Sequence, residues 1–188
     1  MTLLEMKKKI LRLIEEISEG ENLTDDPDIK AKLNDVINQI QFELARMKKI
    51  PVITTETIIE SNLEFELKTL DDFYQLDRVI FKDNEGNELP DVEIFGNYIT
   101  FPEAGIAKIY YFKYPKRITD DAKDNEYKFE LSDDALEILP YGVAADLLKS
   151  DVSNNYGEIY SKRYETMLQR LDPRYSMCSI YIAGGIDI

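Results

Sequence analysis

The chain contains no histidine and no tryptophan among its 188 residues. Without histidine there is no Ser-His-Asp or Cys-His catalysis, no imidazole general base and no metal site that uses imidazole. Imidazole chemistry is thereby excluded, and since no other catalytic or ligand motif is found in the sequence, we expect a protein that is not an enzyme and that binds neither a cofactor nor a metal ion.

Cysteine and long apolar runs are also scarce. The single cysteine, Cys178, cannot form an internal disulfide, which suits a reducing compartment. No apolar run approaches the length of a membrane span, and the charged N-terminus lacks the apolar core of a secretory signal. We expect no contact with a membrane.

Positive charge is in short supply and is unevenly spread. The chain has 23 basic and 37 acidic residues, a net charge of −14. Residues 119–153 hold 3 basic and 10 acidic groups, and residues 51–118 hold 7 and 13. Such a surface repels phosphate, so we expect the acidic excess to face bulk solvent or a DNA channel and not to grip DNA.

Helical periodicity marks both ends of the chain. Thr2 and Glu5 fit a capping box, Gly20 is a helix stop, and Asp26-Pro27 fits a helix start. Ser153 fits the N-cap of the last helix, and Pro140 predicts a kink or a late start in the one before it. The predicted helices span 3–19, 27–48, about 133–150 and 154–171.

The middle of the chain changes to strand periodicity near Pro51 and changes back after Pro115. We expect an antiparallel meander over 52–114, with a tight turn at Gly96-Asn97. The predicted fold class is α+β: a bundle of about four helices with an inserted antiparallel β module and an extended C-terminal tail. The segments are 1–50 and 119–173 for the bundle, 51–118 for the module and 174–188 for the tail.

Two sets of residues are candidates for contacts. The last helix places aromatic and aliphatic side chains three or four residues apart, which predicts one continuous packing face: Tyr156, Tyr160, Tyr164 and Leu168. The tail is apolar and β-prone, and it fits either a contact with another chain or a strand that completes the chain's own sheet. Its candidate contact residues are Tyr175, Met177, Ile180, Tyr181, Ile182 and Ile186.

Acidic clusters have simpler explanations than metal binding. The segment 83–88, DNEGNE, lacks the register of a calcium loop and lies between strands, so a hairpin turn is favoured. Asp120, Asp121, Asp124 and Glu126 fit a solvated acidic loop. Many carboxylates are present, but no motif makes a set of them converge as a metal-dependent nuclease requires.

The order of these elements resembles the head–tail connector (adaptor) proteins of tailed bacteriophages. The resemblance rests on GNYITFPEAGIAKIYYFKYPKRITDD at the end of the β region, on ELSDDALEILPYGVAADLLKSD and on YSKRYETMLQRLDP. It covers most of the chain as a pattern, and no single motif in it is diagnostic.

The resemblance implies a ring, usually of twelve copies, below the portal protein at the capsid vertex. Such a ring extends the DNA channel, lets genomic double-stranded DNA pass without specific binding, and docks tail or neck proteins. It places the protein in the virion neck, and in the host cytoplasm during assembly, with the tail 174–188 as the candidate portal contact. The alternatives are another neck or tail-completion protein, or a cellular protein that binds through its β module.

Overall fold

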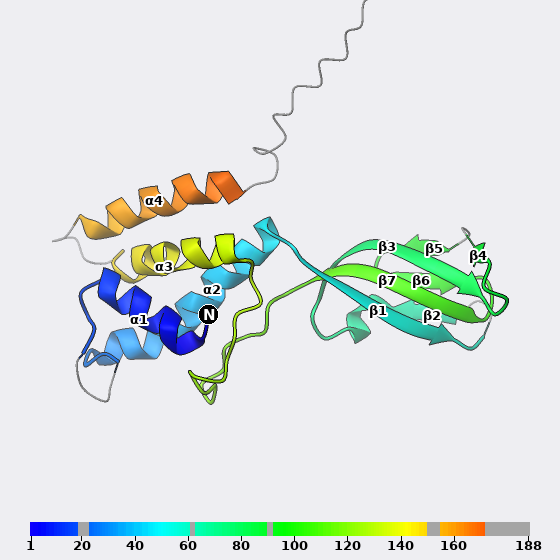
Figure 1. The fold of residues 1–188 in the computed structure, drawn as a ribbon, viewed down its shortest axis with the longest axis horizontal. Coiled ribbons are helices and arrows are strands. Elements are labelled where there is room, and N and C mark those ends of the chain that lie inside the picture. The colour runs from blue at the N-terminus through cyan, green and yellow to red at the C-terminus, as the bar shows by residue number, and fades with distance from the viewer. Residues whose placement is uncertain (19–22, 61–62, 90–91, 150–154, 172–188) are drawn as a thin grey trace, which may run out of the picture. The chain divides into compact units, whose positions relative to one another are not determined.

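A computed structural model describes residues 1–18, 23–60, 63–89, 92–149 and 155–171. The chain forms two compact units: a helical unit made from the described residues of Met1–Lys48 and Arg117–Ile188, and a β module, Lys49–Lys116. Helices and antiparallel sheets together confirm the predicted α+β class (Figure 1). The change of periodicity in the sequence predicts 51–118 for this module.

The helical unit contains α1 (Leu3–Leu13), α2 (Pro27–Met47), α3 (Asp133–Leu147) and α4 (Tyr156–Leu171). Helix α1 was expected to continue to residue 19 but ends at Leu13, because Ile14 leaves helical geometry and Glu15 adopts a left-handed φ of 61°. Helix α3 begins at Asp133 and continues through Pro140, so a late start is wrong. The expected stop at Gly20 and cap at Ser153 lie outside the described residues.

All the free N–H groups at the start of α1 have partners. Thr2 and Glu5 form the predicted capping box. The next two amides donate to carbonyls of the acidic segment after the β module: Leu3 to Tyr127 and Leu4 to Asp124, at 3.1 and 3.0 Å. The segment 118–131 therefore serves as the partner of a helix end that would otherwise need water.

The same segment is fastened to α2 by a buried polar network. The Asn38 carboxamide donates to the carbonyl of Ile118 and accepts from its N–H, both at 2.8 Å. Gln41 donates to Asn38, and the Tyr127 hydroxyl donates to Gln41. Because every step of this chain of bonds is buried, the point where the polypeptide returns from the β module is fixed on α2.

The sequence predicts that this acidic segment is a solvated loop, but part of it is packed against the helical unit. Asp124 forms an ion pair with Lys7 at 2.8 Å, and both side chains are largely covered. Tyr127, Phe129 and Leu131 are buried in the same stretch. Asp120, Asp121 and Glu126 remain exposed, so of the four acidic residues only Asp124 departs from the expectation.

The β module contains two sheets that pack face to face. One has four strands in the order β1 (Ile50–Ile58), β7 (Gly105–Lys113), β3 (Phe73–Asp83) and β4 (Glu88–Leu89). The other has the order β2 (Leu63–Glu66), β6 (Tyr98–Phe101) and β5 (Glu93–Phe95). The meander was wrong for most pairs: the first strand pairs with the last, and only β3–β4 and β5–β6 are sequential hairpins.

The core of the module lies between the two sheets. Phe81 of β3 and Phe101 of β6 are both fully buried, with ring centroids 5.1 Å apart. The DNEGNE segment is the turn of the β3–β4 hairpin, as predicted, with the Asp83 carboxylate accepting from Glu85 and Asn87. The hydrogen bond from the Asn87 side chain lowers the pKa of Asp83.

Asp72 fastens the other end of the module, where its carboxylate accepts from the Tyr111 hydroxyl at 2.9 Å and lies 3.6 Å from the Lys113 ammonium. Burial of the phenol, followed by the bond to Asp72, raises the pKa of Tyr111 to about 12.

None of the helices in the described part of the chain has the length and apolarity that crossing a bilayer requires.

Replacing Asn38 by alanine tests the buried network. The variant leaves both polar groups of Ile118 and the Gln41 amide without their partner, and we expect a loss of about 2–4 kcal/mol in the free energy of unfolding. Urea unfolding followed by circular dichroism at the helical band measures this loss. Asn34→Ala, one turn earlier on α2, is the matched control, because the Asn34 side-chain oxygen has no partner among the described residues. Equal losses for the two variants would contradict the role given to Asn38.

Candidate interaction surfaces

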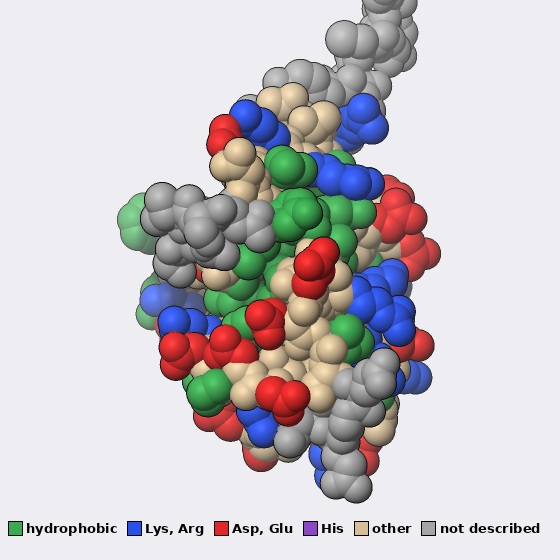
Figure 2. Space-filling view, turned by 90° about the vertical axis from the view of Figure 1, so that its left-hand side faces the viewer, with side chains coloured by type: hydrophobic (Ala, Val, Ile, Leu, Met, Phe, Trp, Pro, Cys, Tyr) green, Lys and Arg blue, Asp and Glu red, His purple; other side chains and the backbone are tan. Residues whose placement is uncertain are grey.

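Helix α4 turns one side of its predicted packing face inward and leaves the other at the surface. Tyr164 and Leu171 are buried, Tyr160 and Leu168 are half-buried, and Tyr156 is 45% exposed. Ile159, which is not among the residues predicted from the sequence, is 53% exposed on the same helix. Figure 2 shows apolar side chains gathered between charged ones on this view of the helical unit.

Tyr164 fills a gap that a glycine provides. A Cβ atom on Gly142 of α3 would lie 2.7 Å from the Tyr164 ring and 3.0 Å from Ile40 of α2. The absence of a side chain at Gly142 therefore lets the three helices meet around one aromatic ring. Burial, reinforced by the nearby Glu43 carboxylate, raises the pKa of Tyr164.

Tyr160 caps the end of α1. Its hydroxyl donates to the carbonyl of Leu13 at 2.7 Å, one of the carbonyls that has no donor within the helix. Its ring lies between those of Tyr141 on α3 and Tyr156, with centroids 6.2 and 6.4 Å away. Tyr160 is thus an internal structural contact between α4 and the rest of the helical unit.

The predicted tail contacts cannot be placed, because all of them lie outside the described residues: Tyr175, Met177, Ile180, Tyr181, Ile182 and Ile186.

The outer face of the four-stranded sheet is apolar and basic. The register places three rows of side chains on it: Thr57–Ile106–Lys82, Thr55–Lys108–Ile80 and Ile53–Tyr110–Arg78. Ile53 and Ile106 are 61% and 49% exposed, and the Arg78 guanidinium lies 4.5 Å from the centre of the Tyr110 ring. We call this surface the basic face.

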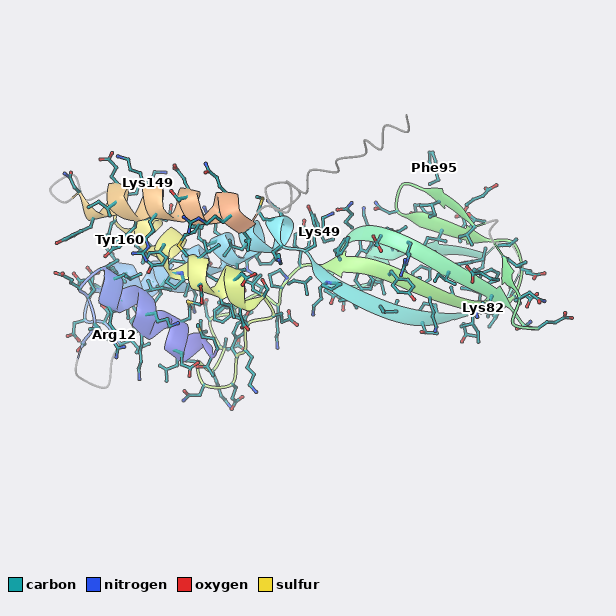
Figure 3. The ribbon with its side chains drawn as sticks, turned by 45° about the horizontal axis from the view of Figure 1, so that its top comes forward. Arg12, Lys49, Lys82, Phe95, Lys149 and Tyr160 are labelled. Atoms are coloured by element: carbon teal, nitrogen blue, oxygen red, sulfur yellow. The ribbon has the colours of Figure 1, made fainter. Side chains whose placement is uncertain are left out.

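The outer face of the three-stranded sheet has the opposite charge. Its two rows are Glu93–Thr100–Glu64 and Phe95–Tyr98–Glu66. In the row between them Ile99 is buried in the core and Phe65 packs against it, while Ile94 on the edge strand is 51% exposed. Phe95 is 87% exposed, and Figure 3 shows its ring pointing away from the module. We call this surface the acidic face. The alternation of side chains in LEFE and GIAKIYYF indicates that each strand has an inner and an outer side. Without the order of strand pairing, it does not indicate which strands lie next to each other on the same face.

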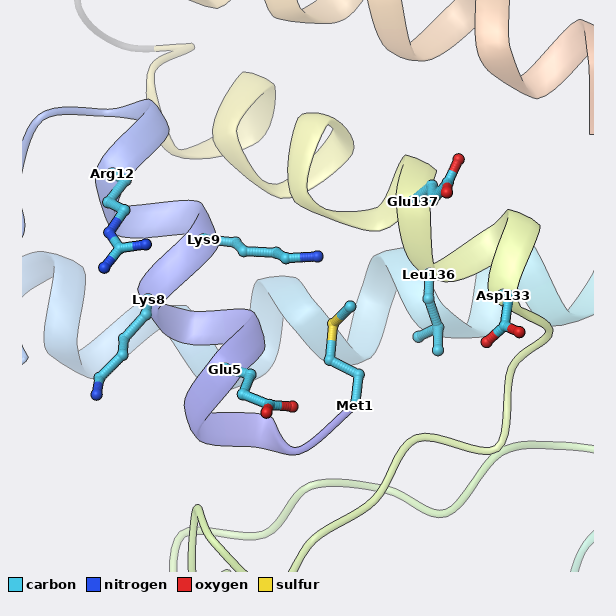
Figure 4. A pocket seen from close by; sticks show the side chains of 8 residues that line it. All are labelled: Met1, Glu5, Lys8, Lys9, Arg12, Asp133, Leu136 and Glu137. Carbon is cyan, nitrogen blue, oxygen red and sulfur yellow. The ribbon is translucent and has the colours of Figure 1, made fainter.

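A trough of about 710 Å³ lies between α1 and α3 in the helical unit. Lys8, Lys9 and Arg12 line it from α1, and Asp133 and Glu137 line it from α3. Lys9 reaches across it toward α3 in Figure 4. The trough therefore brings basic side chains of α1 and acidic side chains of α3 to the same surface.

A smaller pocket of about 380 Å³ contains Tyr141, Pro140 and Arg163, whose guanidinium lies 4.2 Å from the Tyr141 ring centre. Among the residues that the structure describes, no three His, Cys, Asp or Glu side chains come together as a metal site.

Gly142→Ala tests the packing of α4. An alanine normally stabilises a helix interior by about 0.5–1 kcal/mol relative to glycine. Here the added methyl must displace the Tyr164 ring, so we expect a net destabilisation of about 1–3 kcal/mol in thermal or urea unfolding. The double variant with Tyr164→Ala should lose less than the sum of the single variants, because the clash is then absent. Strict additivity would show that the methyl is accommodated elsewhere.

A comparison of the chain with protein-family models and with curated proteins finds no match to either.

Proposed function

We propose that this chain is a structural head–tail connector (adaptor) of a phage virion, and that it forms a ring below the portal which extends the DNA channel and docks the tail. The observation that carries the proposal is the construction of the helical unit. Two helices before the β module and two after it form one bundle, and the returning segment is fastened to α2 through Asn38 and Ile118. This is the arrangement that the resemblance implies.

The kinds of surface on the chain support a role in assembly and not in chemistry. The described residues offer exposed apolar side chains on both units, including Ile159 on α4 and Phe95 on the β module. Large exposed apolar side chains flanked by charge are typical of protein–protein contacts. The proposed partners are the portal protein, tail or neck proteins and further copies of the chain, which form a ring of twelve. The proposed locations are the virion neck and, before assembly, the host cytoplasm.

The charge of the chain supports passage of DNA without binding. A net charge of −14 gives a channel wall that repels phosphate and so does not slow the genome. The protein needs no catalytic group, cofactor or metal for this role.

One observation favours a second candidate function. Phe95 stands at the tip of the β5–β6 hairpin and is 87% exposed, which also fits a recognition module that inserts an aromatic anchor into a partner. A cellular binding protein, or a different neck or tail-completion protein, would use the same hairpin.

Binding to the portal protein of the same genome tests the proposed function. We expect the full chain to form a discrete complex with the portal ring, seen by mass photometry and by negative-stain microscopy as added density on one end. Removal of 174–188 should leave the helical circular dichroism signal unchanged and reduce the complex. An intact chain that leaves the portal unbound would reject the connector role, whereas an unchanged complex after truncation would reject only the role of the tail.

Duplex DNA binding provides a second test. At physiological ionic strength, where the Debye length is about 8 Å, we expect no appreciable shift of a labelled duplex, because the acidic excess cannot release phosphate counterions. Fluorescence anisotropy measures this. Tight binding that weakens steeply with added salt would contradict a passive channel wall.

A further inference from the structure

The β module presents opposite charges on its two outer faces. Arg78, Lys82 and Lys108 lie on the basic face. Among the paired positions of this face the acidic side chain is that of Glu88, which lies opposite Lys82. Glu64, Glu66 and Glu93 lie on the acidic face. The sheets share one core, so these faces point in opposite directions. A net charge of −6 for residues 51–118 gives no hint of this separation.

The charges on both faces are available to a partner. In the part of the chain that the structure describes, no ion pair involves Lys82, Lys108, Glu64 or Glu93, and all four side chains are exposed. Each face also carries large hydrophobic side chains that are exposed to solvent: Ile53 and Ile106 on the basic face, and Phe95 and Tyr98 on the acidic face.

We propose that the basic face of one copy docks on the acidic face of a second copy. A second copy fits because the same module carries both complementary surfaces. Contact between two basic faces, or between two acidic faces, would place like charges together, which disfavours a two-fold symmetric pair. The contact is therefore heterologous, and successive copies add in one direction until the rotation between them closes a ring.

The size of the faces sets the strength of this contact. The acidic face is the smaller of the two. Its strands β2 and β6 have four residues and β5 has three, and with strands about 4.8 Å apart and a rise of about 3.3 Å per residue they cover an area far below the roughly 800 Å² per partner of a standard interface. A single contact is therefore weak, and association depends on concentration until ring closure makes the contacts act together. The closure of a ring rests on the proposed function, whereas the contact between two copies rests on the charges of the two faces.

Charge reversal on each face separately tests the contact in the full-length chain. Sedimentation equilibrium at low salt and high protein concentration measures self-association of the wild type, of K82E/K108E and of E64K/E93K. We expect each variant to weaken the association constant by at least about tenfold, because like charges then meet. K30E/K32E, at exposed positions of α2, changes the net charge as K82E/K108E does and should associate like the wild type.

Exchange of the two charges separates this contact from a general charge effect. An equimolar mixture of K82E/K108E and E64K/E93K, or one chain with all four substitutions, again brings opposite charges together and should restore association. Added salt should weaken both the wild type and the restored pairs.

Three results would overturn the proposal. They are a wild type that stays monomeric at every concentration, single-face variants that associate like the wild type, and failure of the exchanged pair to restore association. If K82E/K108E instead removes binding to duplex DNA, the basic face is a nucleic-acid surface and the proposal is wrong. Portal binding by the wild-type chain is measured separately. A chain that binds the portal but shows no face-dependent association rejects this inference alone. A chain that associates through its faces but does not bind the portal rejects the connector role alone.

Discussion

The pair of hydrogen bonds between the Asn38 carboxamide and the backbone of Ile118 is the constraint on which the helical unit depends. The two halves of this unit are separated in sequence by the whole β module, and loop closure over such a distance opposes their meeting. A buried carboxamide that satisfies both backbone groups of one residue fixes where the second half joins the first. Gln41 and Tyr127 continue the network, and the amides of Leu3 and Leu4 then find their carbonyls on the same segment.

With its two halves joined in this way, the helical unit forms a core that is separate from the core of the β module. Its own core closes between two sheets around Phe81 and Phe101, and Asp72 fastens its base through Tyr111 and Lys113. Both outer faces of the module are then available for contacts with other molecules. A protein built in this way can keep its bundle fixed while surface substitutions on the module change its partners.

The acidic excess of the chain has several physical roles. Asp124 holds α1 through Lys7, Asp83 organises a hairpin turn, and Asp72 accepts from a buried tyrosine. Glu64 and Glu93 instead lie exposed beside the aromatic side chains of the acidic face. Net charge alone predicted repulsion of phosphate, whereas the paired strands show that part of the charge is sorted by face.

The sequence by itself determined the fold class, the capping box at Thr2 and Glu5, the hairpin turns at 83–88 and at Gly96-Asn97, and three of the four helices to within a few residues. These features depend on local periodicity and turn chemistry. It gave α1 too long an extent, since the left-handed Glu15 carries no residue signal. Only the tertiary structure decided that β1 pairs with β7, that Gly142 receives Tyr164, and that lysines and glutamates separate onto opposite faces. Strand partners are chosen by packing between distant segments, so a pattern that shows which side chains share a face cannot show what lies across from it.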